Sequence, residues 1–241
     1  MKVLLTGGSG RLGRELLSLL PDVAAPIRSE LDVTSWESVR DGVRVAHPQV
    51  VVHAAAYTDV AGAETDRDTC WQVNVAGTRH VARAAAEVGA KLVHISTDYV
   101  FSGEQGGYRE ADTPGPVVNF YALSKLVAEE AARAAPRHLS IRTSFRPREF
   151  AYPVAYADVY TSQDYVDLIA PQLALAITHA PEIGDEVLHI ATGRKSVLEL
   201  ARRRRPDVRA GFRAQARVAL PADVSLDSGR WEALRAGWTD G

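Results

Sequence analysis

The chain has 241 residues, 46% hydrophobic and 24% charged, and its 28 basic and 30 acidic side chains give a formal charge of −2. This length and composition exclude a disordered, collagen-like or disulfide-scaffold protein, and they are typical of a globular protein with a buried core. The balanced charge favours neither nucleic acid nor an anionic membrane surface as a partner.

Cysteine content and hydropathy indicate the compartment. The single cysteine, Cys70, cannot form an internal disulfide, which fits a reducing environment, so we expect a cytoplasmic protein. The longest uncharged apolar stretch, Leu168–Pro181, contains prolines and is shorter than the roughly 20 residues that a membrane span needs. We therefore expect no association with a membrane.

Short apolar runs alternate with amphipathic segments along the first 145 residues. This order predicts an α/β fold, a Rossmann-type doubly wound parallel sheet over residues 1–145. Thr34 and Glu37 have the spacing of a capping box, and Gly89 is placed to end the third helix. The predicted strands are Val3–Leu5, Val23–Ile27, Val50–His53, Leu92–Ile95 and His138–Ile141, and the predicted helices are Leu12–Leu20, Ser35–Ala46, Thr69–Val88 and Tyr121–Ala135.

Residues 146–241 show a weaker pattern, beginning with a stretch rich in proline and aromatic residues. We interpret them as a small, abbreviated substrate-binding portion, interleaved with the main sheet. A helix over Gln163–Thr178 is predicted to be interrupted at Pro171, and a strand is predicted over Val187–Ile190. A further helix begins at Ser196, with Glu199 in the capping-box position.

A glycine-rich loop follows the first predicted strand and opens the first predicted helix. Its spacing satisfies both Gly-x-Gly-x-x-Gly and Gly-x-x-Gly-x-x-Gly. Glycines permit a tight turn and a close backbone approach, and the helix N-terminus then faces a pyrophosphate with free N–H groups. We prefer dinucleotide binding to a purely structural turn. The candidate residues here are Gly7, Gly10, Arg11, Leu12 and Gly13.

The end of the second strand decides which nicotinamide cofactor is bound. Arg28 stands where an arginine accommodates a 2′-phosphate, which favours NADPH, although nearby Glu30 keeps NADH open. Asp32 could accept from the adenine amino group, or it could be a turn carboxylate, and Val33 lies beside it. The small residues Ala54, Ala55 and Ala56, after the third strand, leave room for a cofactor lying across the sheet.

Tyr121 and Lys125 carry the strongest chemical signal, because a spacing of four places both on one helical face. A nearby cation favours the phenolate and so lowers a tyrosine pKa. By itself such a pair is also found on exposed helices. Thr97, at the end of the fourth strand, is expected to face the same crevice, because ligands of open α/β sheets bind at the carboxyl ends of strands.

Together with the glycine loop, the blocks His-Ala-Ala-Ala-Tyr-Thr (53–58), Ser-Thr-Asp-Tyr-Val-Phe (96–101) and Tyr121–Lys125 resemble the extended short-chain dehydrogenase/reductases, and within them the dTDP-4-dehydrorhamnose reductases. The resemblance covers about the first 145 residues. It implies that Thr97, Tyr121 and Lys125 are catalytic, with Tyr121 exchanging a proton with the sugar C4 oxygen. Lys125 would hold the nicotinamide ribose and lower the Tyr121 pKa, so both residues also contact the cofactor.

The resemblance also implies substrate contacts by Thr58, Thr97, Asp98 and Phe145. Phe145 is a departure, because a tryptophan usually follows Arg-Thr-Ser in this family and helps to enclose the sugar. The chain then lacks the family's usual glycine-containing segment, so fold and cofactor carry over better than substrate. The resemblance further suggests a homodimer.

Three hypotheses follow for function. The first is an NADPH-dependent reductase of the 4-keto group of a nucleotide-linked 4-keto-6-deoxy sugar. The second is a non-catalytic regulator that binds a dinucleotide or sugar nucleotide on the same fold, and the third is a related epimerase, dehydratase or other carbonyl reductase. The seven histidines show no metal-ligand spacing, so we expect no metal. Glu129 and Glu130 are expected to face solvent.

Overall fold

The computed structural model describes residues 1–216 and 220–239. Its centre is a six-stranded sheet in the order β10-β5-β4-β3-β1-β2, and all the pairings between these strands are parallel. The chain runs from β1 outward to β2 and then crosses back to β3 on the other side of β1, and this change in strand order is that of a doubly wound Rossmann-type sheet, which confirms the predicted fold class. The strands are β1 (Val3–Thr6), β2 (Val23–Ala24), β3 (Val50–His53), β4 (Lys91–Thr97), β5 (His138–Thr143) and β10 (Val187–His189).

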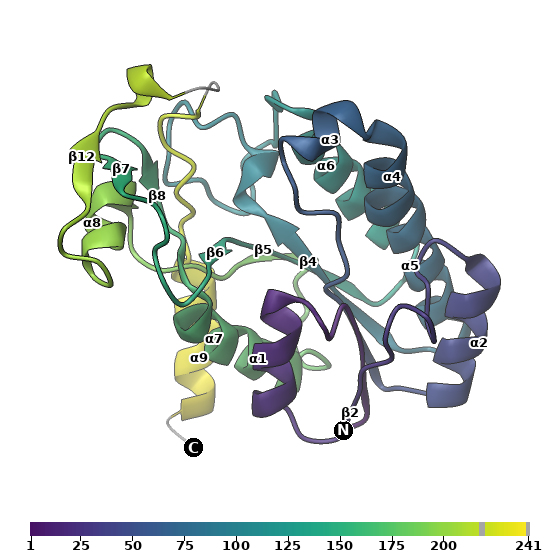
Figure 1. The fold of residues 1–241 in the computed structure, drawn as a ribbon. Coiled ribbons are helices and arrows are strands. Elements are labelled where there is room, and N and C mark those ends of the chain that lie inside the picture. The colour runs from purple at the N-terminus through teal and green to yellow at the C-terminus, as the bar shows by residue number, and fades with distance from the viewer. Residues whose placement is uncertain (217–219, 240–241) are drawn as a thin grey trace.

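Helices cover both faces of this sheet (Figure 1). One face packs against α1 (Arg11–Leu19), α7 (Val166–Thr178) and α9 (Gly229–Thr239). The other packs against α2 (Trp36–Ala46), α5 (Gly77–Glu87) and α6 (Phe120–Ala132). Because both faces are covered, the strand side chains are almost all buried, including the polar ones of β4 and β5.

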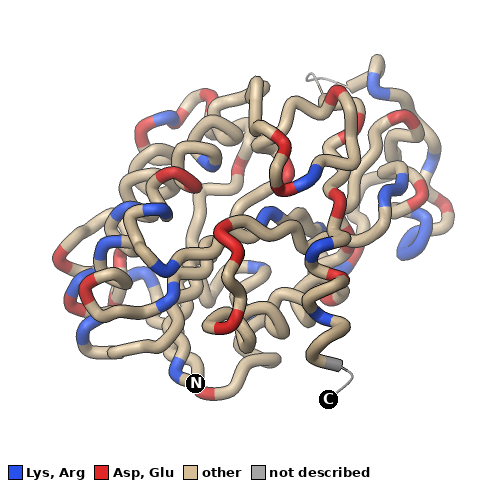
Figure 2. Tube along the Cα trace, turned by 180° about the vertical axis from the view of Figure 1, so that it is seen from behind, with Lys and Arg blue, Asp and Glu red and all other residues tan. Residues whose placement is uncertain are grey.

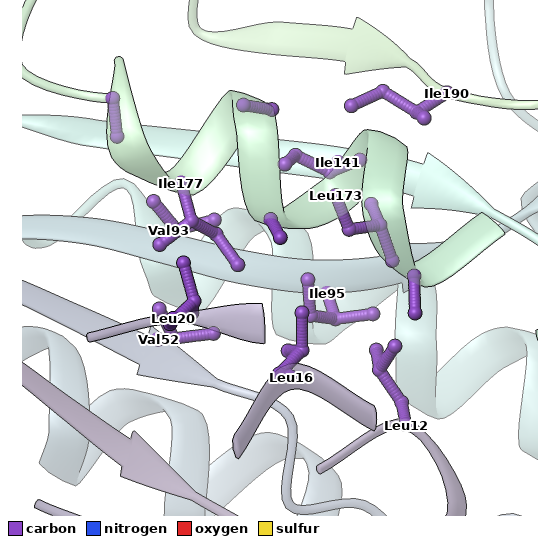
Figure 3. Close-up of a cluster of buried hydrophobic side chains, with 14 of the residues drawn as sticks. Leu12, Leu16, Leu20, Val52, Val93, Ile95, Ile141, Leu173, Ile177 and Ile190 are labelled. Carbon is purple, nitrogen blue, oxygen red and sulfur yellow. The ribbon is translucent and has the colours of Figure 1, made fainter. Parts of the chain in front are cut away.

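The larger core cluster lies between the sheet and the helices α1 and α7 (Figure 3). Leu16 of α1 and Leu173 of α7 both point into it and are fully buried. Val93 and Ile141 reach the same cluster from β4 and β5. Each such side chain contributes about 1.5–3 kcal/mol when it leaves water, so this cluster fixes the sheet that carries the site.

After β5 the chain builds a small lobe and also returns to the sheet. Its elements are β6 (Phe145–Arg146), β7 (Val154–Tyr156), β8 (Tyr160–Thr161), β9 (Asp164–Tyr165), β11 (Lys195–Ser196), α8 (Val197–Arg202), β12 (Arg209–Gly211) and the 3₁₀ turn η3 (Arg213–Gln215). In Figure 1 the lobe that holds α8, β7 and β12 stands apart from α3 and α6. Residues 146–241 also supply β10, α7 and α9, and residues 217–219 and 240–241 lie outside the described part. The domain boundary at residue 145 stays a prediction.

Three predicted elements differ from the structure. The helix expected over 69–88 is three pieces: α4 (Arg67–Trp71), a π-helical turn η1 (Gln72–Ala76) and α5, preceded by the short α3 (Gly62–Thr65). The strand predicted over 23–27 ends at Ala24. The predicted break at Pro171 is wrong, because α7 runs through it. The flanking Ile169 and Leu173 are fully buried, and this packing outweighs the one missing backbone hydrogen bond.

Helix capping is confirmed at one helix and corrected at another. Ser196 and Glu199 form the predicted capping box of α8. The cap of α2 is Ser35 and not Thr34, because Ser35 accepts from the Ser38 backbone N–H. Thr34 instead donates both its N–H and its hydroxyl to Asp32. The α5 helix ends at Glu87, followed by Gly89 with φ of +71°, as the sequence predicted.

Basic and acidic residues are interspersed along the chain (Figure 2). Among the described residues, no helix is both long and apolar enough to cross a membrane. The His, Cys, Asp and Glu side chains of residues 1–216 and 220–239 include no group of three or more that could hold a metal ion.

Candidate active site

A cleft of about 1020 Å³ runs along the carboxyl ends of the central strands. Its size suits a dinucleotide together with a second ligand, since clefts for single small ligands span roughly 300–1,000 Å³. Every residue predicted for cofactor, substrate or catalysis lines it: Gly7, Gly10, Arg11, Leu12, Gly13, Arg28, Asp32, Val33, Ala54, Ala55, Ala56, Thr58, Thr97, Asp98, Tyr121, Lys125 and Phe145.

The glycine loop is shaped to bring its backbone close to a ligand. Gly7 has φ of +78°, and a Cβ there would lie 2.6 Å from the backbone nitrogen of Ala55. A Cβ on Gly13 would lie 2.2 Å from the Gly7 carbonyl oxygen. Gly10 precedes α1 without a side-chain cap, so the first N–H groups of this helix are free to meet a phosphate. These residues therefore fit the pyrophosphate of a dinucleotide.

Arg28 and Asp32 lie together at the far end of the cleft. The Arg28 Nε and the Asp32 Oδ2 are 3.9 Å apart, and 79% of the Arg28 side chain is exposed. Asp32 accepts from the Thr34 backbone N–H at 2.9 Å, a bond that lowers the pKa of the carboxyl. One carboxylate oxygen of Asp32 therefore accepts the hydrogen bonds that hold the turn at Thr34. The Arg28 side chain is mostly exposed and can reach a ligand in the cleft.

The α6 helix positions Tyr121 and Lys125. It begins at Asn119, whose side-chain oxygen accepts from the Ala122 N–H at 2.8 Å. The Tyr121 ring meets the edge of the Tyr99 ring at 6.2 Å. Thr97, the last residue of β4, lines the same part of the cleft as Tyr121. Thr97, Tyr121 and Lys125 therefore line the same cleft.

Burial sets the charge states at this point. Burial raises the pKa of Tyr121, and the Asp98 charge adds to this rise, while the Thr97 hydrogen bond opposes it. The expected lowering by Lys125 is wrong for this structure, because its ammonium points into β4 and donates to the Ile95 carbonyl oxygen at 2.8 Å. Burial lowers the pKa of Lys125 to about 8, so the amine is still mainly charged at neutral pH.

Asp98 is the second titratable group that faces Tyr121. Burial raises its pKa to about 6, and hydrogen bonds from Ser144 and Thr97 oppose that shift. Its Oδ2 atom is buried and accepts no hydrogen bond in the structure. A buried acceptor without a donor is costly, so a hydroxyl group of a ligand would be stabilised at this oxygen.

The buried side chain of Asn74 lies outside the predicted site and holds its framework. Asn74, in the π-helical turn, exchanges hydrogen bonds with the backbone N–H and C=O of Tyr57, at 2.8 and 3.1 Å. It also donates to Ser124 of α6 at 2.9 Å. Asn74 thus ties the loop after β3 to α6. A buried asparagine in an apolar helix was the available signal, and only the fold supplied its partners.

Glu129 was predicted to face solvent, and this is wrong. It is 5% exposed and forms a two-pronged ion pair with Arg142, with N···O distances of 2.9 and 3.0 Å. Ser96 also donates to Glu129. The pair joins α6 to the ends of β4 and β5, directly beneath the residues that line the cleft. Glu130, the next residue, is exposed, as expected. It forms an ion pair with Arg133.

Comparisons with known proteins agree with this architecture. A dTDP-4-dehydrorhamnose reductase of Mycobacterium tuberculosis is 37% identical over 188 residues, which cover 74% of this chain and 57% of that protein. One from Aggregatibacter actinomycetemcomitans is 33% identical, with 79% of this chain and 67% of that protein covered. The chain thus spans between about half and two thirds of the length of these curated relatives.

A solved structure resembles the whole described fold. The dTDP-4-dehydrorhamnose reductase from Bacillus anthracis, in complex with NADP, superposes with a TM-score of 0.85 and 29% sequence identity. The match covers 97% of this chain and 92% of that one. Residues 1–201 match the family described as the RmlD substrate binding domain. The chain belongs to this family.

Proposed function

We propose that the protein reduces the 4-keto group of a nucleotide-linked 4-keto-6-deoxy sugar, with NADPH as the reductant. The observation that carries the proposal is the meeting of Thr97, Tyr121 and Lys125 in one cleft with a glycine loop shaped for a pyrophosphate. The names of its relatives, and the NADP in the Bacillus anthracis structure, support the same substrate class and cofactor.

The cofactor residues have separate tasks. When bound, NADPH supplies the hydride that reduces the carbonyl carbon. The glycine loop and the N-terminus of α1 hold its pyrophosphate, and Arg28 pairs with the 2′-phosphate. Lys125, whose ammonium lies within reach of the cleft, holds the nicotinamide ribose. These contacts orient the cofactor over Ala54, Ala55 and Ala56, whose small side chains leave the space open.

Tyr121 is the proton donor of the proposed reaction. Its raised pKa keeps the phenol protonated at neutral pH, which is the state that reduction requires. As the carbonyl oxygen gains negative charge, Tyr121 gives it the phenolic proton, and Thr97 holds the same oxygen by a hydrogen bond. Phe145 and Thr58 close the substrate side of the cleft.

The test is the loss of NADPH absorbance on addition of a dTDP-4-keto-6-deoxyhexose, in the wild type and in Tyr121→Phe. Removal of a general acid typically lowers kcat by about 10²- to 10⁴-fold. Because Tyr121 is also expected to contact the cofactor, NADPH binding is measured in both proteins, which separates loss of the proton donor from loss of cofactor affinity. Wild-type protein that binds NADPH but does not turn over this substrate would contradict the proposal. That result would favour the regulator or the other carbonyl reductases.

We also propose a cytoplasmic location and a homodimer. The first rests on the single cysteine, Cys70, which is buried and cannot form an internal disulfide. The second rests on the resemblance to the reductases. Sedimentation velocity of the purified protein measures the oligomeric state directly.

A further inference from the structure

The cleft contains one cationic side chain that the proposed mechanism does not use. Among the described residues that line it, the cations are Arg11, Arg28, Lys125 and Arg146. The first two lie at the cofactor end, and Lys125 lies at the reacting centre. Arg146 lies in β6, directly after Phe145.

The Arg146 side chain is half-buried and forms no ion pair with a carboxylate in the described part of the chain. Its Nε atom is buried with no hydrogen-bond partner. None of the ion pairs found among the described residues includes Arg146, whereas nearby Arg148, Arg203 and Arg204 each pair with a carboxylate. Arginine stays charged even where burial lowers its pKa, as burial does here. An anionic ligand would stabilise a charged, partly buried donor that has no ion-pair partner.

The surroundings of Arg146 fix its orientation. Its guanidinium carbon lies 5.4 Å from the centre of the Phe150 ring, and β6 pairs in parallel with β9. Tyr99 and Asp98 are among the groups that interact electrostatically with it. Tyr99 also contacts Tyr121, and Tyr99, Tyr121 and Arg146 all line the cleft. Another carboxylate in the cleft lining, Glu149, is exposed and forms no ion pair with Arg146.

We infer that Arg146 binds the pyrophosphate of the nucleotide-sugar substrate and so selects a nucleotide-linked sugar over a free one. This inference rests on the proposed function. In a 4-keto-6-deoxy sugar nucleotide the pyrophosphate is the only anionic group, and it joins the sugar at the ring carbon opposite C4. With the C4 oxygen at Tyr121, the phosphates lie one sugar ring away, and we assign Arg146 as their partner because it lines the same cleft. The cofactor's own pyrophosphate is held elsewhere, at the glycine loop.

The experiment measures ligand binding without turnover. Binding of dTDP and of thymidine is titrated by calorimetry with the NADPH-loaded wild type, Arg146→Gln and Arg146→Lys. Loss of charged hydrogen bonds should weaken dTDP binding by about 10- to 100-fold in Arg146→Gln, and thymidine binding should not change. Arg146→Lys should fall between the two, because a lysine keeps the charge but loses the planar fork.

The matched control is Arg148→Gln, two residues along the chain. Arg148 is exposed and pairs with Glu15, so dTDP binding should stay at the wild-type level. NADPH affinity checks that each variant is folded. Equal dTDP affinity in the wild type and Arg146→Gln overturns the inference but does not contradict the proposed reductase. A fall in kcat with unchanged dTDP binding has the same two consequences. A wild type that binds dTDP no more tightly than thymidine overturns the inference, and it also counts against a nucleotide-sugar substrate.

Discussion

The buried ion pair between Glu129 and Arg142 makes a strong prediction about stability. Their side chains are 6% and 4% exposed, and the Arg142 guanidinium also lies 5.0 Å over the Phe101 ring. Glu129→Gln keeps the shape of the side chain but leaves the Arg142 charge buried without its counter-charge. Breaking such a pair typically costs about 3–5 kcal/mol of unfolding free energy. For a domain of this size, that lowers the melting temperature by about 6–20 °C.

The assay is thermal and urea unfolding at pH 7, followed by circular dichroism. The control is Glu130→Gln on the same helix, which removes an exposed pair with Arg133 and should leave the melting temperature within error. The double variant Glu129→Leu with Arg142→Met should recover most of the loss, because no unpaired charge then stays buried. If Glu129→Gln and Glu130→Gln lower the melting temperature equally, the pair does not stabilise the fold as argued.

Three further predictions concern the glycine loop, the cofactor and pH. Gly13→Ala places a Cβ 2.2 Å from the Gly7 carbonyl oxygen, so NADPH affinity should fall at least about 10-fold. Gly184→Ala, where nothing lies within 4 Å, is the control, and equal affinities would contradict the close approach. Arg28→Ala should raise the KM for NADPH about 10-fold and leave that for NADH unchanged, and a parallel rise for both would exclude contact with the 2′-phosphate. Burial lowers the pKa of His189 to about 4 from an unfolded value near 6.5. The contribution of neutral His189 to the free energy of unfolding is therefore complete above pH 6.5 and is lost as the pH falls toward 4. The pH dependence of urea unfolding should then be flatter in His189→Asn.

Local chemistry made much of this protein readable from its sequence. The glycine loop was identifiable because a tight turn between a strand and a helix admits few other residues. The pairing of Tyr121 with Lys125 follows from helical geometry, in which residues four apart share a face. The parallel sheet follows from buried strands alternating with amphipathic helices. These features depend on near neighbours in the chain, so one sequence was sufficient to place them.

Long-range packing decided the rest. Sequence could not separate Glu129 from Glu130, because which of two adjacent carboxylates turns inward depends on how α6 packs against β4 and β5. The sequence suggested that Lys125 lowers the pKa of Tyr121, yet burial by the assembled cleft raises it. The sequence did not distinguish Arg146 from the other arginines; the fold places it in the lining of the cleft without an ion-pair partner among the described residues. Burial and ion pairing depend on residues far apart in the chain, and only the tertiary structure brings those residues together.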